Sequence, residues 1–336
     1  MLRPCQTDAG GQTDEGGEVV RYAAGRVLQM VLTLFVVLTL LWVAISVLPG
    51  DPVRALFGFR QPSPEAYARV QEQLRLDRPL PEQYLLHLRD VLSLDLGQTL
   101  PRDPFGTPEP GIEVWALIWG AGPTSAVLLA GALAVQAVVG VAAGALSAAR
   151  TGTALGRSVD ALALLAVATP VLVAAYVSRT VFGVQLRLLP VSGVSAGWTS
   201  YVLPVLSLAA LSTGYVALLV KGELRVALRA PCTAAARARG LSPFRVTAVH
   251  ALRPSLIPVA TFLAANLGQL VTGLIVVEGV FGVPGVGGLL FSAMAERDRS
   301  LVVGIVTFVA LLVIVANALA DIAVAALDPR LRSAQP

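Results

Sequence analysis

Few residues in this sequence have the types and the spacing that catalysis requires. The only lysine, Lys221, lies outside any glycine-rich phosphate loop, and neither a His-Glu-x-x-His zinc motif nor a Gly-x-Ser-x-Gly nucleophile motif is present. The two histidines, His87 and His250, lie far apart in the chain. Cys5 and Cys232 do not have the spacing of a disulfide framework or a metal cluster. The sequence therefore predicts a chain that is not an enzyme and that binds no cofactor or metal itself.

The most informative stretch is instead basic and rich in small residues, and it covers residues 233–258 between two long apolar runs. Its first part, residues 234–239, consists of good helix formers, and Gly240 follows where helices often end in a left-handed residue. Ser242 can then act as an N-cap, and Pro243 can take the first position of a second helix. The stretch predicts two short helices joined by a tight turn.

The first of these helices has the composition of a docking element. Its alanines leave little bulk on one face, so that another protein can approach the backbone closely, and arginines lie beside that face. The residues predicted to contact a partner are Ala235, Ala236, Arg237, Arg239 and Gly240. An ordinary solvated basic loop is the alternative interpretation.

Composition indicates a membrane protein. Hydrophobic residues make up 55% of the chain and charged residues 14%, with a mean hydropathy of +0.73, which is unlike soluble domains. Uncharged runs of about 20 residues recur, so we expect an all-α integral membrane protein with six spanning helices. The predicted spans are residues 27–48, 125–149, 161–184 with a kink at Pro170, 202–220, 254–277 and 300–327. A signal peptide is the alternative for the first run, but no cleavage site follows it.

The polar segments divide the chain into regions. We expect a disordered N-terminal tail at 1–19, a first membrane helix at 20–48, an extracytoplasmic loop at 49–124, a transmembrane domain at 125–332 with a cytosolic loop at 221–256, and a C-terminal tail at 333–336. The short segments on the outer side hold only three basic residues, Arg187, Arg297 and Arg299, which predicts that both termini are cytosolic. The net charge of +4 is spread over both sides of the membrane and favours no nucleic-acid partner.

Small residues in two predicted spans indicate close helix packing. The second span contains Gly140-Val-Ala-Ala-Gly144. In the span 254–277, Asn266 and Gln269 lie beside small residues that recur every four positions, which suits either helix packing or the lining of a solute pathway.

Carboxylates in or near the predicted spans are few. An ion-coupled secondary transporter would need them, and only Asp321 and Glu278 are available. For Asp321, which lies near the cytosolic end of the last span, a contact between helices is the preferred interpretation. Ion-coupled transport stays as the alternative function of another class.

Between the fifth and sixth spans the sequence is too apolar for a free loop and too rich in glycine for a spanning helix. Irregular backbone at membrane depth is tolerated only against protein or a water-filled cavity, so we expect this segment to fold back over the outer mouth as a gate. Its glycines would permit backbone geometry that a Cβ would obstruct. We define the gate motif as Glu278, Phe281, Pro284, Gly285 and Gly287.

Both stretches resemble one family. Ala235 and Ala236, followed after three residues by Gly240, resemble the "EAA" loop of binding-protein-dependent ABC transporter permeases. The stretch His-Ala-Leu-Arg, which begins at His250, is similar to the sequence of the dipeptide/oligopeptide and nickel branch of this family. The gate motif is also similar to a motif of the same family. One departure is Ala234, which stands where the wider family has its name-giving glutamate. The resemblance covers nearly all of the chain after the N-terminal tail.

This resemblance implies a function and a set of partners. The chain would be one permease subunit of an ATP-driven ABC importer, with the helix at 234–240 coupled to an ATPase and the gate motif at the outer mouth. The implied partners are a second related permease in a heterodimer, two ATPase subunits or domains that use ATP, an extracytoplasmic solute-binding protein and the lipid bilayer. Dipeptides or oligopeptides are the expected solutes, and nickel chelates or other solutes of the same family are the alternative.

Overall fold

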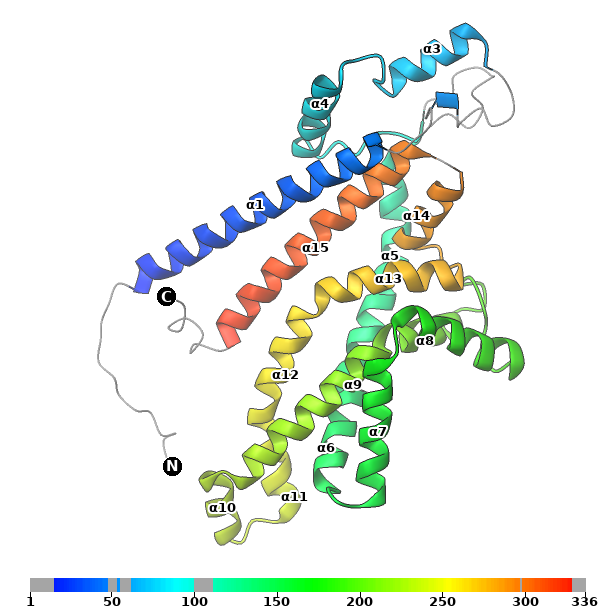
Figure 1. Cartoon of the computed structure of the whole chain (residues 1–336). Helices are drawn as coiled ribbons and strands as arrows, with labels where there is room; N and C mark the ends of the chain where they lie inside the picture. The colour runs from blue at the N-terminus through cyan, green and yellow to red at the C-terminus, as the bar shows by residue number, and fades with distance from the viewer. Residues whose placement is uncertain (1–14, 48–52, 55–61, 100–110, 297, 328–336) are drawn as a thin grey trace.

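The structure, a computed structural model, describes residues 15–47, 53–54, 62–99, 111–296 and 298–327, and these ranges are mostly helical (Figure 1). Its α-helices are α1 (Glu15–Val47), α3 (Pro64–Gln73), α4 (Leu80–Leu92), α5 (Val114–Val135), α6 (Val141–Ala149), α7 (Ala154–Ala168), α8 (Val171–Ser178), α9 (Thr199–Arg229), α10 (Pro231–Ala238), α11 (Pro243–Arg245), α12 (Arg253–Ala265), α13 (Leu267–Phe281), α14 (Val286–Ala295) and α15 (Arg299–Leu327). Three π-helices adjoin them: η1 (Gln136–Gly140), η2 (Arg179–Gln185) and η3 (Val246–Leu252). Within the described ranges, the only β-pairing outside named strands is an isolated bridge between Gln98 and Glu113. The predicted all-α fold is confirmed for these residues.

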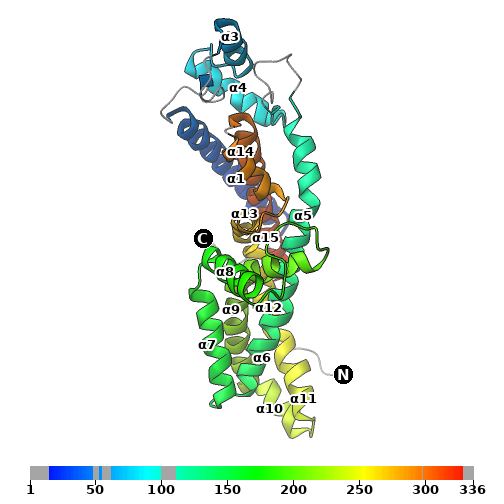
Figure 2. The same cartoon turned by 90° about the vertical axis from the view of Figure 1, so that its right-hand side faces the viewer.

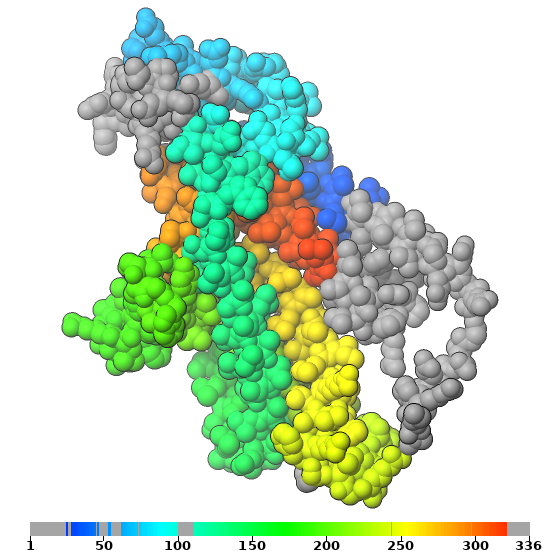
Figure 3. All heavy atoms as spheres, turned by 180° about the vertical axis from the view of Figure 1, so that it is seen from behind, coloured from blue at the N-terminus to red at the C-terminus, as the bar shows by residue number. Residues whose placement is uncertain are grey.

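The helices form an elongated bundle with two distinct ends. α3 and α4 lie at one end, and α10 and α11 lie at the other (Figures 1 and 2). Seen from behind, cyan atoms lie at the first end, and the yellow-green and yellow atoms that follow α9 lie at the second beside green atoms (Figure 3). α9 is the central helix and packs against α5, α6, α7, α8 and α12, while α1 packs against α15 and α4.

Glycines bring the continuous stretch of α5, η1 and α6 close to α9. A Cβ at Gly140 would lie 2.7 Å from Cγ1 of Val216, and a Cβ at Gly144 would lie 2.4 Å from the carbonyl oxygen of Ala217. A real Cβ cannot sit so close to another atom, so this contact requires glycine at both positions. Small residues at four-residue spacing are a common means of helix packing in membranes. The close packing predicted for this pattern is confirmed.

Several helical stretches are long and apolar enough to cross a membrane. Among the described residues there are four: Val114–Ala149, Thr199–Arg229, Val246–Ala265 and Arg299–Ala320. The number rises to six if each of two bent helix pairs, α7 with α8–η2 and α13 with α14, counts as one span. The apolar stretch of α1, Leu28–Ala44, is shorter. The chain is therefore a multi-span helical protein, and the assignment of six particular spans stays a prediction.

The predicted span 161–184 contains a sharp bend rather than a kink. α7 and the following α8–η2 stretch form an angle of 110°. Thr169 is extended, with φ −91° and ψ 115°, and Pro170 precedes the first residue of α8. The residue before a proline is pushed out of the helical region, and proline has no N–H to continue the helical hydrogen bonds. Pro170 thus lies at the predicted position, with a larger change of direction than expected.

The prediction of one continuous helix over 254–277 is wrong. α12 ends at Ala265, and α13 begins at Leu267 after a turn at Asn266. α13 is bent in turn by 61° relative to α14, across a break of a few residues. The glycine-rich segment after α13 is therefore mostly helical, whereas irregular backbone was expected there. Its short break is the irregular part.

Boundaries at the chain ends differ modestly from the prediction. α1 begins at Glu15, so residues 15–19 of the predicted tail are helical. The rest of that tail, residues 1–14, and the predicted tail at 333–336 lie outside the described residues. Asp321 lies in α15.

The predicted loop at 49–124 contains two short helices, α3 and α4. Its last residues, from Val114 on, belong to the longer helix α5. α3 begins as its sequence predicts, because the Ser63 hydroxyl oxygen accepts the N–H of Ala66 at 3.2 Å. α4 contacts α1, where the hydroxyl groups of Tyr84 and Thr39 lie 2.7 Å apart. α5 begins at Val114 rather than at the predicted residue 125. The loop residues 48–52, 55–61 and 100–110 lie outside the described ranges.

Candidate functional site

The predicted docking helix is α10, and it begins before the alanine run. Pro231 takes the first position after an extended Ala230, with φ −64° and ψ 146°. The Thr233 hydroxyl donates a hydrogen bond of 2.7 Å to the carbonyl oxygen of Ala227 in the last turn of α9, and Thr233 is fully buried. Because this bond spans the junction, it helps to hold α10 at a fixed angle to α9.

The turn after α10 has the geometry that its sequence predicts. Gly240 has a φ of 77°, in the left-handed region. Its N–H donates to the carbonyl oxygen of Arg237 at 2.9 Å, and the N–H of Leu241 donates to that of Ala236 at 3.4 Å. These two hydrogen bonds define the Schellman motif, which favours glycine at the left-handed position. The predicted helix end at Gly240 is confirmed.

Ser242 begins the next helical stretch, as predicted. Its hydroxyl oxygen accepts the N–H of Arg245 at 3.4 Å, and its carbonyl oxygen accepts the N–H of Val246 at 3.0 Å. The short helix α11 continues into η3, which packs against both α9 and α10. The turn is therefore anchored at both ends and presents α10 and α11 as one unit.

One predicted contact residue of α10 faces the wrong way for a partner. Ala236 is only 6% exposed and, together with Thr233, lies on the side of α10 that is buried within the chain. The helix starts at Pro231, and its packing on α9 and η3 decides which alanines point outward. The exposed residues are Ala234, Ala235, Arg237, Ala238, Arg239 and Gly240. Of the two predicted alanines, only Ala235 is available for docking, and Ala234 and Ala238 are exposed as well.

Away from α10 and nearer the middle of the bundle, the gate motif joins α13 to α14 (Figures 1 and 2). Glu278 lies in α13 and is fully buried. Its Oε1 accepts the Ser125 hydroxyl at 2.6 Å, and its Oε2 accepts the N–H groups of Gly287 at 2.6 Å and Gly288 at 3.3 Å. Ser125 in turn accepts the N–H of Val286 at 2.9 Å. α14 thus begins on oxygen acceptors that satisfy its free N–H groups and suit the positive end of its dipole.

Two glycines of the gate motif leave room for this carboxylate. A Cβ at Gly285 would lie 2.1 Å from Oε1 of Glu278, and a Cβ at Gly287 would lie 2.5 Å from Cα of Ile275. Gly285 has a φ of −105°, which any residue can adopt, so the requirement for glycine is one of space. Gly282 is different, since its φ of 56° ends α13 in the left-handed region.

The end of α13 is held by contacts from η2 and the loop that follows it. The last carbonyl groups of a helix have no partner within the helix. Here the carbonyl oxygen of Val280 accepts Nη1 of Arg179 at 2.8 Å, and that of Phe281 accepts the N–H of Gly193 at 2.9 Å. Phe281 itself is only 1% exposed. These contacts, together with the Glu278 carboxylate, fix both sides of the α13–α14 break.

A cavity of about 570 Å³ adjoins the break. Its walls come from α5, the end of α13 and α14, and they include Ala116, Gly120, Glu278, Pro284 and Phe291. The five residues of the gate motif thus lie together at the break, and two of them, Glu278 and Pro284, line this partly open cavity. Their role as a gate stays a prediction.

The two amides considered for a solute pathway have different surroundings. Asn266 is 5% exposed, and its Nδ2 donates to the Ser212 hydroxyl at 2.7 Å and lies 3.5 Å from Oε1 of the fully buried Gln136. This cluster joins η1, α9 and the α12–α13 turn, so Asn266 contributes to helix packing. Gln269 is exposed on α13, as is Thr272, one turn further along the helix. Only Gln269 of the predicted pair is exposed, and its place in a solute pathway stays a prediction.

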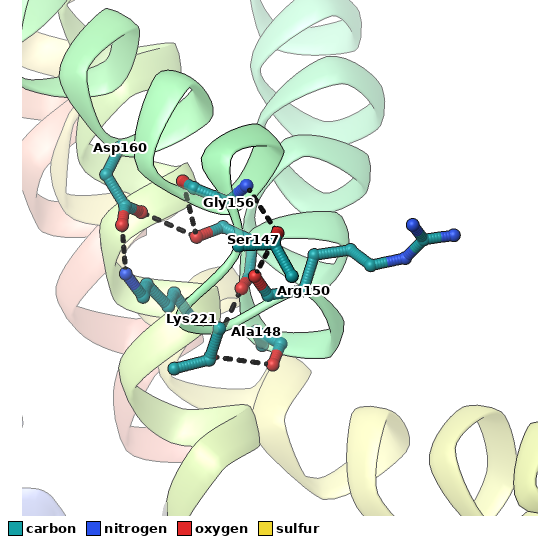
Figure 4. Close-up of polar contacts among 8 residues, drawn as sticks. Ser147, Ala148, Arg150, Gly156, Asp160 and Lys221 are labelled. Carbon is teal, nitrogen blue, oxygen red and sulfur yellow. Dashed lines mark hydrogen bonds and ion pairs between the residues drawn. The ribbon is translucent and has the colours of Figure 1, made fainter.

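Sequence reasoning missed a polar cluster near the α10 end of the bundle. The carboxylate of Asp160 in α7 accepts the Ser147 hydroxyl of α6 at 2.5 Å and forms an ion pair with Lys221 of α9 (Figure 4). The ion-pair side chains are 19% exposed for Lys221 and 26% for Asp160. Both charged residues lie at the edges of apolar runs, and this position was the sequence feature that could have indicated a role for them. Their pairing spans 61 positions and therefore has no local pattern.

Family profiles match most of the chain. The family described as "Binding-protein-dependent transport system inner membrane component" matches residues 140–333. A second family, described as "Binding-prot-dependent transport system membrane comp, N-term", matches residues 19–100. The first match contains α10, the gate motif and the Asp160–Lys221 pair.

Relatives are similar over nearly their full length. The oligopeptide transport system permease protein OppB of Haemophilus influenzae is 32% identical, over 94% of this chain and all of the relative. The dipeptide transport system permease protein DppB of Bacillus subtilis is 30% identical, over 94% of this chain and 98% of the relative. OppB of Escherichia coli (strain K12) is 29% identical, over 94% and 100% respectively.

Proposed function

Because this chain belongs to the binding-protein-dependent transport system inner membrane component family, we propose that it forms half of the translocation path of an ATP-driven importer of peptides. It is a permease subunit of an ABC importer and a multi-pass inner membrane protein. The proposal of peptides as solutes is supported by the oligopeptide and dipeptide permeases that it resembles over nearly their whole length. Nickel chelates are the alternative solutes.

The observation that carries the coupling proposal is the rigid corner between α9 and α10. α10 is tied to α9 through Thr233, closed by the Schellman motif at Gly240 and exposed on its small, arginine-flanked side. In the proposed assembly this side lies in a groove of an ATPase subunit, and that subunit supplies ATP hydrolysis. A second related permease, a second ATPase and an extracytoplasmic solute-binding protein complete the importer.

The proposed cycle links α10 to the α13–α14 break. ATP binding closes the ATPase pair and moves α10, and α9 carries this movement into the bundle as a rigid element. The α13–α14 break then opens the path toward the solute-binding protein, and Gln269 faces that path. Glu278 has no part in ion coupling in this scheme, because its oxygens are occupied by Ser125, Gly287 and Gly288.

The proposed topology places α3 and α4 on the extracytoplasmic side of the membrane and α10 in the cytosol, with six spans and both termini cytosolic. Ser93, after α4, and Ser242, after α10, are both exposed. In a background without Cys5 and Cys232, an impermeant maleimide should label Ser93→Cys in intact cells and Ser242→Cys only in permeabilised ones. Labelling of both in intact cells would refute this topology.

Ala235→Trp tests the coupling proposal. The new indole would overpack the proposed groove at a cost of about 1–3 kcal/mol, which weakens ATPase binding roughly five- to 150-fold. The bundle should be unaffected because Ala235 is exposed. Copurification of the ATPase with a tagged permease and solute-stimulated ATP hydrolysis measure the effect. Ala196→Trp is the control, since Ala196 is also exposed but precedes α9 at its other end. Full ATPase retention by Ala235→Trp would remove the main support for the proposal.

A further inference from the structure

Phe244 is a large apolar side chain with no cover in the described structure. It is the middle residue of α11, and it is 83% exposed. Among the large hydrophobic residues described, only Leu92 at the opposite end of the bundle is equally exposed. α11 lies beside α10 at the end of the molecule in both views (Figures 1 and 2).

The position of Phe244 along the bundle argues against contact with lipid. Ala251, seven residues further on, packs in one cluster with Leu224 of α9 and Ala148 of α6. The neighbouring charged residues Arg225 and Arg150 are exposed at that level, as expected where a span meets the headgroups. Seven helical residues correspond to roughly 10 Å at about 1.5 Å per residue. Phe244 therefore lies about that far beyond the headgroup level, on the side where α10 is found.

The surroundings of Phe244 indicate the chemistry of its partner. Exposed guanidinium groups are present on both short helices of the turn, at Arg237, Arg239 and Arg245. An aromatic side chain with arginines near it is the composition typical of the residues that dominate protein interfaces. The matching surface is an apolar pocket with an acidic rim.

We propose that Phe244 is a second anchor of the ATPase interface, inserting into an apolar pocket beside the groove that holds α10. This inference rests on the proposed function. The turn between the two helices is fixed by the hydrogen bonds at Gly240 and Ser242, so α10 and Phe244 reach one partner together. Docking then has two parts: a small surface that permits close approach, and an aromatic side chain that resists lateral sliding.

Photo-cross-linking in membranes that contain the complete importer tests this inference. Benzoylphenylalanine would replace Phe244, Arg237 or Leu92 in separate variants, and adducts would be identified by mass spectrometry. Arg237 is an exposed, long side chain of α10, so the probe adds little bulk there. Positions 244 and 237 should both give an adduct with the ATPase subunit, and position 92 should give none. If position 237 cross-links to the ATPase but position 244 gives only a lipid adduct, an adduct with a second copy of this chain or no adduct, this inference alone is overturned. Absence of ATPase adducts at both 244 and 237 would overturn the proposed function as well.

Phe244→Ser provides an independent measurement. Loss of an anchor should reduce ATPase copurification about tenfold or more, as expected for a dominant interface residue. The melting temperature of the isolated permease should stay unchanged, because the side chain is exposed. Leu92→Ser is the matched control, with the same exposure at the other end of the bundle. Unchanged copurification by Phe244→Ser would contradict the inference.

Discussion

Gly285→Val should reduce solute uptake to less than about a tenth of normal, because the α13–α14 junction has no space for a side chain at this position. The first added carbon would lie 2.1 Å from a carboxylate oxygen of Glu278. That carboxylate cannot move without releasing Ser125, Gly287 and Gly288, and each hydrogen bond to a charged group contributes about 1.5–3 kcal/mol. The start of α14 would therefore shift away from α13.

ATPase copurification separates this local effect from a loss of the whole fold. It should remain normal in Gly285→Val, because α10 lies at the far end of the bundle (Figures 1 and 2). Gly120→Val is the matched control: Gly120 lines the same cavity, but a Cβ there meets nothing within 4 Å. Its uptake should stay close to normal. Normal uptake by Gly285→Val at normal expression would show that the junction does not control the path.

Asp160→Asn should destabilise the bundle and impair uptake. The substitution keeps the size of the side chain but leaves the Lys221 ammonium, which is 19% exposed, without its counter-charge. Breaking a fully buried pair costs about 3–5 kcal/mol, and partial exposure reduces this to roughly 1–3 kcal/mol. Because Lys221 lies in the same helix that leads into α10, the loss also weakens the contact of α7 with the part of α9 nearest α10. Thermal unfolding of the purified permease and uptake in cells measure the two effects.

A double-mutant cycle distinguishes an ion pair from two unrelated sites. Lys221→Met alone should also be destabilising, and Asp160→Asn combined with Lys221→Met should be less so than the two single effects added together. Residues in direct contact typically differ from additivity by about 0.5–3 kcal/mol. Strictly additive effects would indicate that the contact in Figure 4 does not stabilise the bundle.

Features that depend on neighbouring residues were predictable from the sequence. Gly240 and Ser242 fix the turn after α10 through their own backbone and side chain, so their types were sufficient. Close helix packing at Gly140 and Gly144 was also predictable, because residues four apart lie on one face of a helix. Pro170 marked a break for a similarly local reason.

Features that depend on distant residues were not predictable in the same way. At the helix break, Asn266 donates a hydrogen bond to Ser212, 54 positions earlier in the chain, and a contact over that separation leaves no local pattern in the sequence. The orientation of Ala236 depends on how α10 packs on α9 and η3, which an alanine run cannot specify. The Asp160–Lys221 ion pair also joins residues that are distant in the sequence, so it could not be predicted from local pattern. The sequence predicted the five residues of the gate motif as one unit. It did not predict that the Glu278 carboxylate accepts the first N–H groups of α14, because this contact depends on how α13 and α14 are placed in space.

The length of α9 has a mechanical consequence. Its 31 residues correspond to about 46 Å at roughly 1.5 Å per residue, whereas the hydrocarbon core of a bilayer is about 30 Å thick. A helix of this length that moves as a rigid body is a lever longer than the hydrocarbon core is thick, and Pro204 lies close to the end remote from α10. A tilt of about 7° around that end displaces the tip by about 5.4 Å, one helical turn. A small rotation of α9 within the bundle thus corresponds to a displacement of one helical turn at α10. Conversely, a displacement of one helical turn at α10 corresponds to only a small rotation of α9 within the bundle.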